Sequence, residues 1–276
     1  MIHEQIHLKD RFPFLGGEGK DPVLKVYVPS CIEELSREDA LLPGILICPG
    51  GGYTHCSQRE NELVALHFLA KGYRCFVLEY SCSPHRYPTQ LREVAAAMEV
   101  IAENAAAWNC DSKRIALMGF SAGGHLAAHY ANCFDCDEVR AVFPESKGVK
   151  ATVLCYAVIS AQPGICHMGS FQNLTGQEEL TPEQIEKFSI DRQVTKRTPP
   201  SFIWHTAEDT WVPTLNSLLY AQALSREQIP YGLHVYPYGR HGLATVDKLT
   251  NNVLHDYERL GANWISAAQD WLELML

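Results

Sequence analysis

The 276-residue sequence lacks long apolar stretches, and positive charge is scarce in it. No apolar run approaches the length of about 18 residues that a membrane-spanning helix needs. Its 23 lysines and arginines are outnumbered by 32 acidic residues, which gives a net charge of −9. This balance argues against nucleic acid and an anionic membrane as partners. The segment from His3 to Asp10 has no apolar core of a signal peptide, so we expect a cytoplasmic protein.

Motifs for phosphates, dinucleotides and metals are also missing. The glycine run Gly50–Gly52 lacks the Gly-Lys-Ser/Thr ending of a P-loop and the G-x-G-x-x-G spacing of a dinucleotide site. Cys133-Phe-Asp-Cys136 is a single C-x-x-C without a second pair at zinc-site spacing, which favours structural thiols. We therefore expect no metal and no cofactor.

The segment His3-Glu-Gln-Ile-His7 matches the H-E-x-x-H pattern of zinc proteases, but that pattern requires a helix. Here Ile2, Ile6 and Leu8 alternate with the two histidines, which indicates an edge strand. In a strand the histidines would lie about 13 Å apart, too far to share a zinc ion. We therefore do not expect a metalloprotease.

The cysteines do not indicate a disulfide framework. Cys48, Cys75 and Cys155 each lie in a hydrophobic run, where free buried thiols are the simpler interpretation. The composition, with 46% hydrophobic and 20% charged residues, is ordinary for a globular protein. The length suits one large core, and we expect a single domain over residues 1–276.

One serine stands between glycines where a predicted strand meets a predicted helix. Apolar residues 115–118 precede the segment Gly119-Phe-Ser-Ala-Gly123, and an alanine-rich stretch follows it. In this G-x-S-x-G pattern, the backbones of the strand and the helix approach so closely that a Cβ at either glycine would collide with them. The pattern predicts a nucleophile elbow that exposes Ser121. The alternative is an ordinary glycine-rich turn.

A serine hydroxyl needs a base to take its proton and a carboxylate to orient that base. Residues 200–205 form a predicted strand, and the polar loop after it carries Asp209. We expect Asp209 to be the acid, with Glu208 as the competing residue. The other alternative is that Asp209 only caps a helix beginning near Pro213.

The predicted base is His241. It lies in the glycine-flanked loop Tyr238-Gly-Arg-His-Gly242, which follows the predicted strand 232–237. This places serine, acid and histidine in the chain order of an α/β-hydrolase.

Other histidines have structural interpretations. His205 and His234 lie inside strand patterns, where a buried imidazole bonded to the backbone is expected. His125 follows Ser121 by one helical turn and is expected to brace the elbow rather than take its proton.

Acyl transfer also needs N–H donors aimed at the oxyanion that forms during the reaction. The apolar run Leu46–Cys48 breaks into three glycines, which allow the backbone to turn its amides toward a site. We predict an oxyanion hole formed by the amides of Gly51, Gly52 and Ala122, the residue after the nucleophile.

These segments together resemble the α/β-hydrolase esterases of the hormone-sensitive-lipase and acetyl-esterase type. Pro49-Gly-Gly-Gly-Tyr53 is similar to the His-Gly-Gly-Gly oxyanion motif of that group, with Pro49 in place of the histidine. This departure points toward acetylxylan-esterase-like and "xylanase B-like" sugar-ester hydrolases. Further likeness lies in three segments, Tyr87–Val94, Asp111–Ile115 and Asp209–Pro213. The resemblance implies ester hydrolysis through an acyl-enzyme, without a cofactor.

Predicted strands and helices alternate along the chain. The strands are 23–29, 44–48, 73–80, 114–119, 151–157, 200–206 and 232–237, and the clearest helices are 58–71, 90–107 and 253–275. This alternation predicts an α/β fold with a mostly parallel central sheet, helices on both faces and the active loops at its carboxyl edge.

Residues 159–198 interrupt the alternation just before the acid-bearing strand. A connection of this length favours a small cap over the site. His167, Met168 and Phe171 are candidates to line the pocket. The alternative is that they form a small core within the cap.

The sequence therefore predicts a serine carboxylesterase that hydrolyses short-chain acyl esters, with acetylated sugars as one possible class of small-molecule substrate. The alternatives are an amide- or peptide-cleaving relative, formamidase-like or oligopeptidase-like, and a ligand-binding protein that has lost turnover. The fold by itself does not decide among them.

Overall fold

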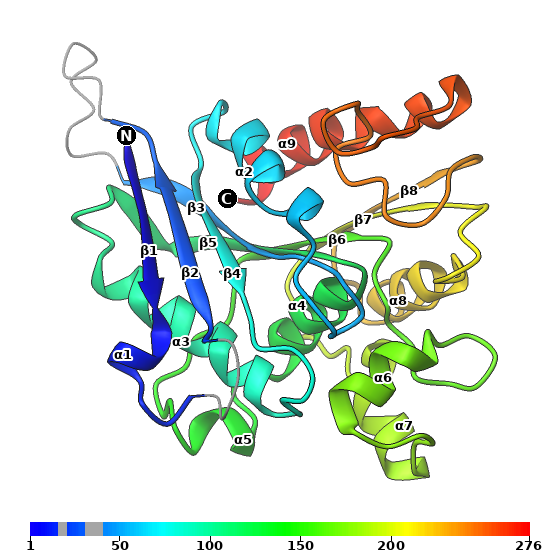
Figure 1. Cartoon of the computed structure of the whole chain (residues 1–276), viewed down its shortest axis with the longest axis horizontal. Helices are drawn as coiled ribbons and strands as arrows, with labels where there is room; N and C mark the ends of the chain where they lie inside the picture. The colour runs from blue at the N-terminus through cyan, green and yellow to red at the C-terminus, as the bar shows by residue number, and fades with distance from the viewer. Residues whose placement is uncertain (16–20, 31–40) are drawn as a thin grey trace.

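The computed structural model describes residues 1–15, 21–30 and 41–276, and a mixed eight-stranded sheet forms its centre (Figure 1). The strand order is β1-β2-β4-β3-β5-β6-β7-β8. Pairs β1–β2 and β2–β4 are antiparallel and the other pairs are parallel. The strands are β1 (Ile2–His7), β2 (Val23–Val28), β3 (Leu42–Cys48), β4 (Arg74–Glu79), β5 (Cys110–Phe120), β6 (Ala151–Cys155), β7 (Ser201–Thr206) and β8 (Tyr231–Tyr236).

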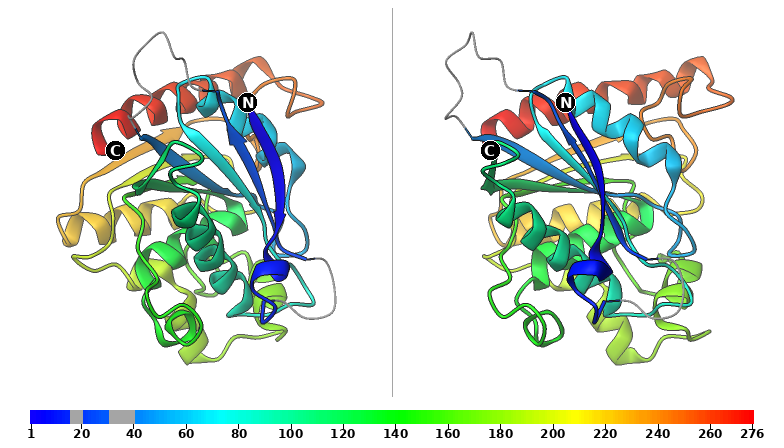
Figure 2. Two further views of the ribbon diagram at one scale, coloured as in Figure 1. Left: turned by 90° about the vertical axis from the view of Figure 1, so that its left-hand side faces the viewer. Right: turned by 60° about the vertical axis from the view of Figure 1, so that its left-hand side comes forward.

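Helices cover both faces of this sheet (Figure 2). One face packs against α2 (Glu62–Leu69) and α9 (Trp264–Met275). The other face packs against α3 (Thr89–Glu103), α4 (Ser121–Cys133) and α8 (Leu215–Arg226). The shorter elements are α1 (Leu8–Arg11), η2 (Gln58–Glu60), α5 (Asp137–Arg140), α6 (Met168–Thr175), α7 (Pro182–Phe188), η3 (Ile190–Arg192) and η4 (Asp256–Asn263).

The central strands are apolar on both sides because both sides are covered. In β3, Ile45 and Ile47 point into the core beneath α2 and α9, whereas Leu46 and Cys48 point into the core beneath α3 and α4. Successive side chains of a strand face opposite ways, so a strand between two helical layers needs a continuous apolar run. The α/β prediction is confirmed by this arrangement.

The predicted edge strand at the N-terminus is present as β1, so His3 and His7 do not share a helix face. No group of three metal-ligating side chains occurs within the described ranges. In the same ranges, no helix combines the length and apolar character needed to cross a bilayer.

All three predicted helices extend beyond the observed ones, and the helix expected over 90–107 ends at Glu103 as α3. The helix expected over 58–71 is divided into η2 and α2 at Asn61, whose φ and ψ of −109° and −116° are not helical. The division follows from Glu60, because its carboxylate turns inward to bind the backbone of Gly50. The helix expected over 253–275 begins as the 3₁₀ element η4, where Glu258 bonds back to the amide of His255.

The nine cysteines of the described residues are free. Cys48, Cys75 and Cys155 are buried, as predicted for apolar strand positions. The remaining cysteine, Cys31, lies outside the described residues. Burial raises the pKa of Cys133 to about 12, which keeps this thiol protonated at neutral pH.

Residues 159–198 contain α6, α7 and η3, which lie beside the carboxyl end of the sheet (Figure 1). The amide of Ile190 donates to the carbonyl of Ile159, and the amide of Tyr87 donates to the carbonyl of Leu174. Phe171 and Phe188 are buried against the main core. The segment is therefore packed onto the sheet domain rather than folded around a separate core.

Candidate active site

Ser121 occupies the junction between β5 and α4, where its backbone has a left-handed φ of 51°. A Cβ on Gly119 would lie 2.2 Å from the carbonyl oxygen of Gly123, and a Cβ on Gly123 would lie 2.2 Å from that of Cys48. Both contacts are impossible, so each glycine is required for a different close approach. The first brings α4 onto its own strand, and the second brings α4 onto the neighbouring β3.

The structure brings Ser121, His241 and Asp209 together from three separate loops. The hydroxyl of Ser121 lies 2.8 Å from Nε2 of His241. Nδ1 of the same ring lies 2.6 Å from Oδ2 of Asp209. Since a carboxylate only accepts hydrogen bonds, Nδ1 carries a hydrogen, and Nε2 is left to accept from the serine.

Asp209 is buried and receives four hydrogen bonds. Its Oδ1 accepts from the amides of Trp211 and Val212, and its Oδ2 accepts from the rings of His241 and His205. Burial alone would raise the pKa of Asp209, but the bonds from His205 and His241 outweigh burial and hold it well below its usual value. The carboxylate therefore stays charged at any ordinary pH.

The alternatives for the acid have other partners in the structure. Glu208 is exposed and accepts from the amide of Gly239 in the turn after β8. The helix after Asp209 is α8, which begins at Leu215, beyond the two amides that Asp209 binds. Asp209 is thus the carboxylate that faces His241.

The other histidines behave differently from one another. His125 is fully buried, with Nδ1 bonded to the hydroxyl of Tyr53 and Nε2 to the carbonyl of Phe188. It therefore connects the glycine loop to residues 159–198. His234 lies on β8 and stacks on Phe202. His205 contacts Asp209, which its strand pattern did not predict.

The glycine loop after β3 leaves amides free beside Ser121. Gly51 and Gly52 have φ values of 124° and 60°, which favour glycine. Their amides have no hydrogen-bond partner among residues 1–15, 21–30 and 41–276. Asn173 of α6 donates to the carbonyl of Gly52 at 2.9 Å and fixes the following peptide. Ala122 is the second residue of α4, where first-turn amides have no helical acceptor.

Glu60 is a second buried carboxylate, and the sequence pattern did not identify it. Its oxygens accept from the amide of Gly50 at 2.8 Å and from the hydroxyl of Tyr156 at 2.7 Å. The same hydroxyl accepts from the amide of Ala244, three residues after His241. Glu60 therefore joins the glycine loop, the end of β6 and the histidine loop.

Arg59 supports the histidine loop from the same turn of chain as Glu60. Its guanidinium donates to the carbonyls of Gly242 and Thr250. Neither Arg59 nor Glu60 belongs to a motif, and only their position between the loops reveals this contribution.

A hollow of about 550 Å³ opens above Ser121 and His241. Its wall combines apolar surface with several polar side chains, and the ring of Trp211, 69% exposed, is nearly parallel to that of His241. His167 lines this hollow, whereas Phe171 is buried in the core and Met168 is not part of the wall. The wall also includes Gly51, Gly52, Thr54, His55, Ser57, Arg59, Glu60, Gly169, Asn173, Thr210, Arg240 and Gly242.

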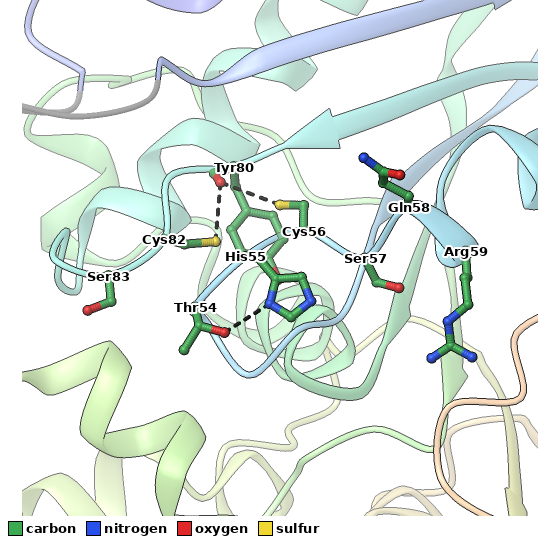
Figure 3. A pocket seen from close by; sticks show the side chains of 9 residues that line it. All are labelled: Thr54, His55, Cys56, Ser57, Gln58, Arg59, Tyr80, Cys82 and Ser83. Carbon is green, nitrogen blue, oxygen red and sulfur yellow. Dashed lines mark hydrogen bonds between the residues drawn. The ribbon is translucent and has the colours of Figure 1, made fainter.

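A second hollow of about 600 Å³ adjoins the first across the segment 54–59 (Figure 3). It is lined by Thr54, His55, Cys56, Ser57, Gln58, Arg59, Tyr80, Cys82 and Ser83. Its lining includes hydroxyl, amide, imidazole and guanidinium groups but no carboxylate. Such groups suit a ligand rich in hydroxyls.

Comparisons with known proteins identify a family and several similar hydrolases. Residues 26–224 match the model of the BD-FAE family. The chain is 36% identical over 231 residues to endo-1,4-beta-xylanase B of Butyrivibrio fibrisolvens, covering 80% of this chain and 35% of that protein. It is 31% identical over 226 residues to an acetylxylan esterase of Xylanibacter ruminicola, covering 79% and 44%. The chain thus spans less than half the length of these curated relatives.

Several solved structures are similar over almost the whole of both chains. The acetyl ester-xyloside bifunctional hydrolase from Caldicellulosiruptor lactoaceticus superposes with a TM-score of 0.83 at 34% identity. The match covers 98% of this chain and 96% of that one. The predicted fold class is confirmed by this agreement.

Proposed function

The chain belongs to the BD-FAE family, and from this premise we propose that it is a serine carboxylesterase that hydrolyses short-chain acyl esters such as acetylated sugars. The observation that carries the proposal is the hydrogen-bonded series Ser121–His241–Asp209 beside the free amides of Gly51 and Gly52. A hydroxyl, an imidazole and a carboxylate in this order are the requirements for acyl transfer to serine.

In the proposed cycle, Ser121 Oγ attacks the ester carbonyl while Nε2 of His241 takes its proton. Asp209 stabilises the imidazolium that forms. His241 then protonates the departing alcohol, which leaves an acyl-enzyme on Ser121. Water, activated by the same nitrogen, releases the acid.

The oxyanion would be held by the amides of Gly51, Gly52 and Ala122. Preorganised donors of this kind contribute because they bind charge that develops only in the transition state. Support comes from Asn173 and Glu60, since their bonds to Gly52 and Gly50 hold the glycine loop on both sides of Gly51.

The polar side chains shared by the two hollows, among them Thr54, Ser57 and Arg59, support an alcohol rich in hydroxyls. The second hollow extends this polar surface past segment 54–59, and Trp211 offers one exposed ring face. A sugar combines hydroxyls with apolar C–H faces and suits both features. The relatives named an acetylxylan esterase and an acetyl ester-xyloside hydrolase support the same substrate class.

We further propose that residues 1–276 form a single hydrolase domain with 159–198 as a cap-like insertion. His167 and Asn173 support this, because the insertion contributes both to the hollow above Ser121. The proposed partner is a small-molecule ester in the cytoplasm. Neither nucleic acid nor a membrane is proposed.

The test compares hydrolysis of p-nitrophenyl acetate, butyrate and octanoate by the wild type and Ser121→Ala. We expect turnover that is fastest on acetate and depends on Ser121. Acetylated xylo-oligosaccharides then test the sugar class through the release of acetate. Absence of Ser121-dependent turnover on every ester would contradict the proposal and favour an amidase or a binding protein.

A further inference from the structure

His205 lies near the end of β7 and is fully buried against Asp209. Its Nε2 is 3.2 Å from Asp209 Oδ2 and 2.9 Å from the carbonyl oxygen of Val212. Both neighbours only accept hydrogen bonds, so Nε2 must carry a hydrogen. Its Nδ1 lies 2.8 Å from the hydroxyl of Ser217 in α8, which is able to donate to it. The ring is therefore fixed on both sides.

We propose that His205 is a positioning residue whose Nε2–H holds Oδ2 of Asp209 in place for Nδ1 of His241. The inference rests on the proposed serine-esterase function and adds a second imidazole to the hydrogen bonds that hold Asp209. It also assigns a purpose to a buried, titratable side chain that the reaction itself does not use.

The need for such a donor follows from the burial of Asp209. Its side chain has no exposed surface, and a buried carboxylate is costly unless its oxygens are bonded. The amides of Trp211 and Val212 serve only Oδ1. Without His205, Oδ2 would have His241 as its one donor, and nothing but that ring would hold Oδ2 in place.

The loss of His205 would also change how strongly His241 holds its proton. Two donors share the negative charge on Oδ2, whereas a single donor faces all of it. Removing the Nε2–H of His205 therefore strengthens the attraction between Asp209 and protonated His241. His241 then becomes an active base only at higher pH.

Other charged and titratable groups face His241 from neighbouring elements, and each of them would also influence its titration. They are His55 and the η2 residues Arg59 and Glu60, His167 before α6, Arg240 beside His241 itself, and the ring of Tyr156 after β6. Hydrogen bonds from these groups to the carboxylate of Asp209 do not occur among the described residues. They remain unchanged in variants of His205, so a difference between two such variants reports on His205 alone.

The experiment compares His205→Phe with His205→Gln. Phenylalanine keeps the ring and removes the donor, whereas glutamine places an N–H near the position of Nε2. We expect His205→Phe to lower kcat about tenfold or more and to move the acid midpoint of kcat/KM upward by about half a pH unit. His205→Gln should keep kcat within about threefold of the wild type. His234→Phe, the same change on the neighbouring strand, is the matched control.

A folded His205→Phe variant with the wild-type midpoint and kcat would overturn the inference. So would a His205→Gln variant as impaired as His205→Phe, because only packing would then matter.

Nitrogen-15 spectra of histidine-labelled wild type give a test that needs neither a variant nor a substrate. We expect His205 to carry hydrogen on Nε2 across about pH 5 to 9. An Nδ1–H tautomer without Nε2–H would contradict the inference. Should ester hydrolysis be absent while Nε2–H is present and coupled to Asp209, the proposed function fails and the positioning contact stands.

Discussion

The two buried carboxylates beside the candidate site are held by different kinds of donor. Asp209, after β7, accepts from two imidazoles and two backbone amides. Glu60, in η2, accepts from a backbone amide and a phenol, and no basic side chain pairs with it in the described part of the chain. The phenol is that of Tyr156, and burial is the main cause that raises its pKa well above the usual value. Tyr156 therefore stays neutral.

This contrast separates two tasks within one site. The region of Asp209 pairs a fixed negative charge with rings that can gain a proton, which is what a proton relay needs. The region of Glu60 contains donors that keep their hydrogens, and it connects loops that must not move relative to one another. Changes in the first region should act mainly on chemistry, and changes in the second on loop geometry and folding.

The largest effect is expected from His241→Ala. Loss of the base should lower kcat on p-nitrophenyl acetate by roughly 10⁴-fold or more, and Ser121→Ala should do the same. The double variant should lose little beyond either single variant, because the two side chains act as a unit. Additive losses would show instead that they work independently.

The next largest effect is expected from Asp209→Asn. An amide that presents its NH₂ group to Nδ1 moves the hydrogen of His241 to the wrong nitrogen, and one that presents its neutral oxygen no longer stabilises the imidazolium. Steady-state kinetics should give a fall in kcat of roughly 10³- to 10⁴-fold with a smaller change in KM. A loss below about tenfold would remove Asp209 from the proposed relay.

Glu60→Gln tests the other side of the comparison. One of its two donors must then face an NH₂ group, which should cost about 1–3 kcal/mol of unfolding free energy. We expect roughly tenfold lower kcat without an upward shift of the acid midpoint, because the variant keeps both donors to Asp209 Oδ2 and removes a negative charge near His241. Urea titration and pH-dependent kinetics measure both, with the exposed Glu179→Gln as the control. An upward shift of the acid midpoint, like the one expected for His205→Phe, would erase the distinction between the two regions.

The free energy of unfolding should fall in two different pH ranges, one set by His125 beside the glycine loop and one set by Asp209. Burial lowers the pKa of His125, which accepts from Tyr53 of the glycine loop, to about 4. The unfolded chain protonates this histidine below about pH 6.5 and the folded chain does not, so unfolding free energy falls from there down to about pH 4. The steepest loss is about 1.4 kcal/mol per pH unit.

Folding lowers the pKa of Asp209 too, but the group is an acid, so it stabilises the fold in its charged form and loses this contribution at a lower pH than His125. Its pKa is depressed by folding, so its contribution is present above about pH 4 and is lost as the pH falls below that value. Thermal melting between about pH 7 and 3 measures both windows. His125→Gln should reduce the loss in the upper window, to which His129 also contributes because burial lowers its pKa to about 3. Asp209→Asn should flatten the lower window. An unchanged melting temperature down to about pH 4.5 would contradict the neutral, buried state of His125.

The smallest effect is expected from Gln58→Trp, which fills the second hollow. We expect KM for an acetylated xylo-oligosaccharide to rise about three- to tenfold, with a smaller change for p-nitrophenyl acetate, which is too short to reach it. Gln222→Trp on the exposed side of α8 is the matched control. Equal changes on both substrates would show that the hollow does not bind the alcohol.

Much of the fold could be predicted because the chain alternates in a regular way. The strand and helix periods place β2 to β8 within a few residues, and the same patterns identify α3. The division of the helix expected over 58–71 could not be predicted, since it depends on Glu60 turning toward Gly50 and Tyr156, one close in sequence and one far along the chain. Local periodicity carries no information on such partners.

The proposed site shows the same limit. Ser121 and His241 could be identified because glycines mark their loops. His205 was assigned a structural interpretation, since its position in a strand reveals nothing of the turn that brings Asp209 back onto its ring. Glu60 and Asn173 had no motif at all, and only the folded chain places them against the glycine loop.

The left-handed backbone of Ser121 has a consequence for laboratory selection. A side chain at a φ of 51° stores conformational strain, of order 1–3 kcal/mol, that glycine would largely avoid. Libraries sorted only by heat resistance should therefore enrich Ser121→Gly, and with it molecules unable to form an acyl intermediate. A selection for higher thermal stability must therefore measure turnover as well as melting temperature in variants of Ser121.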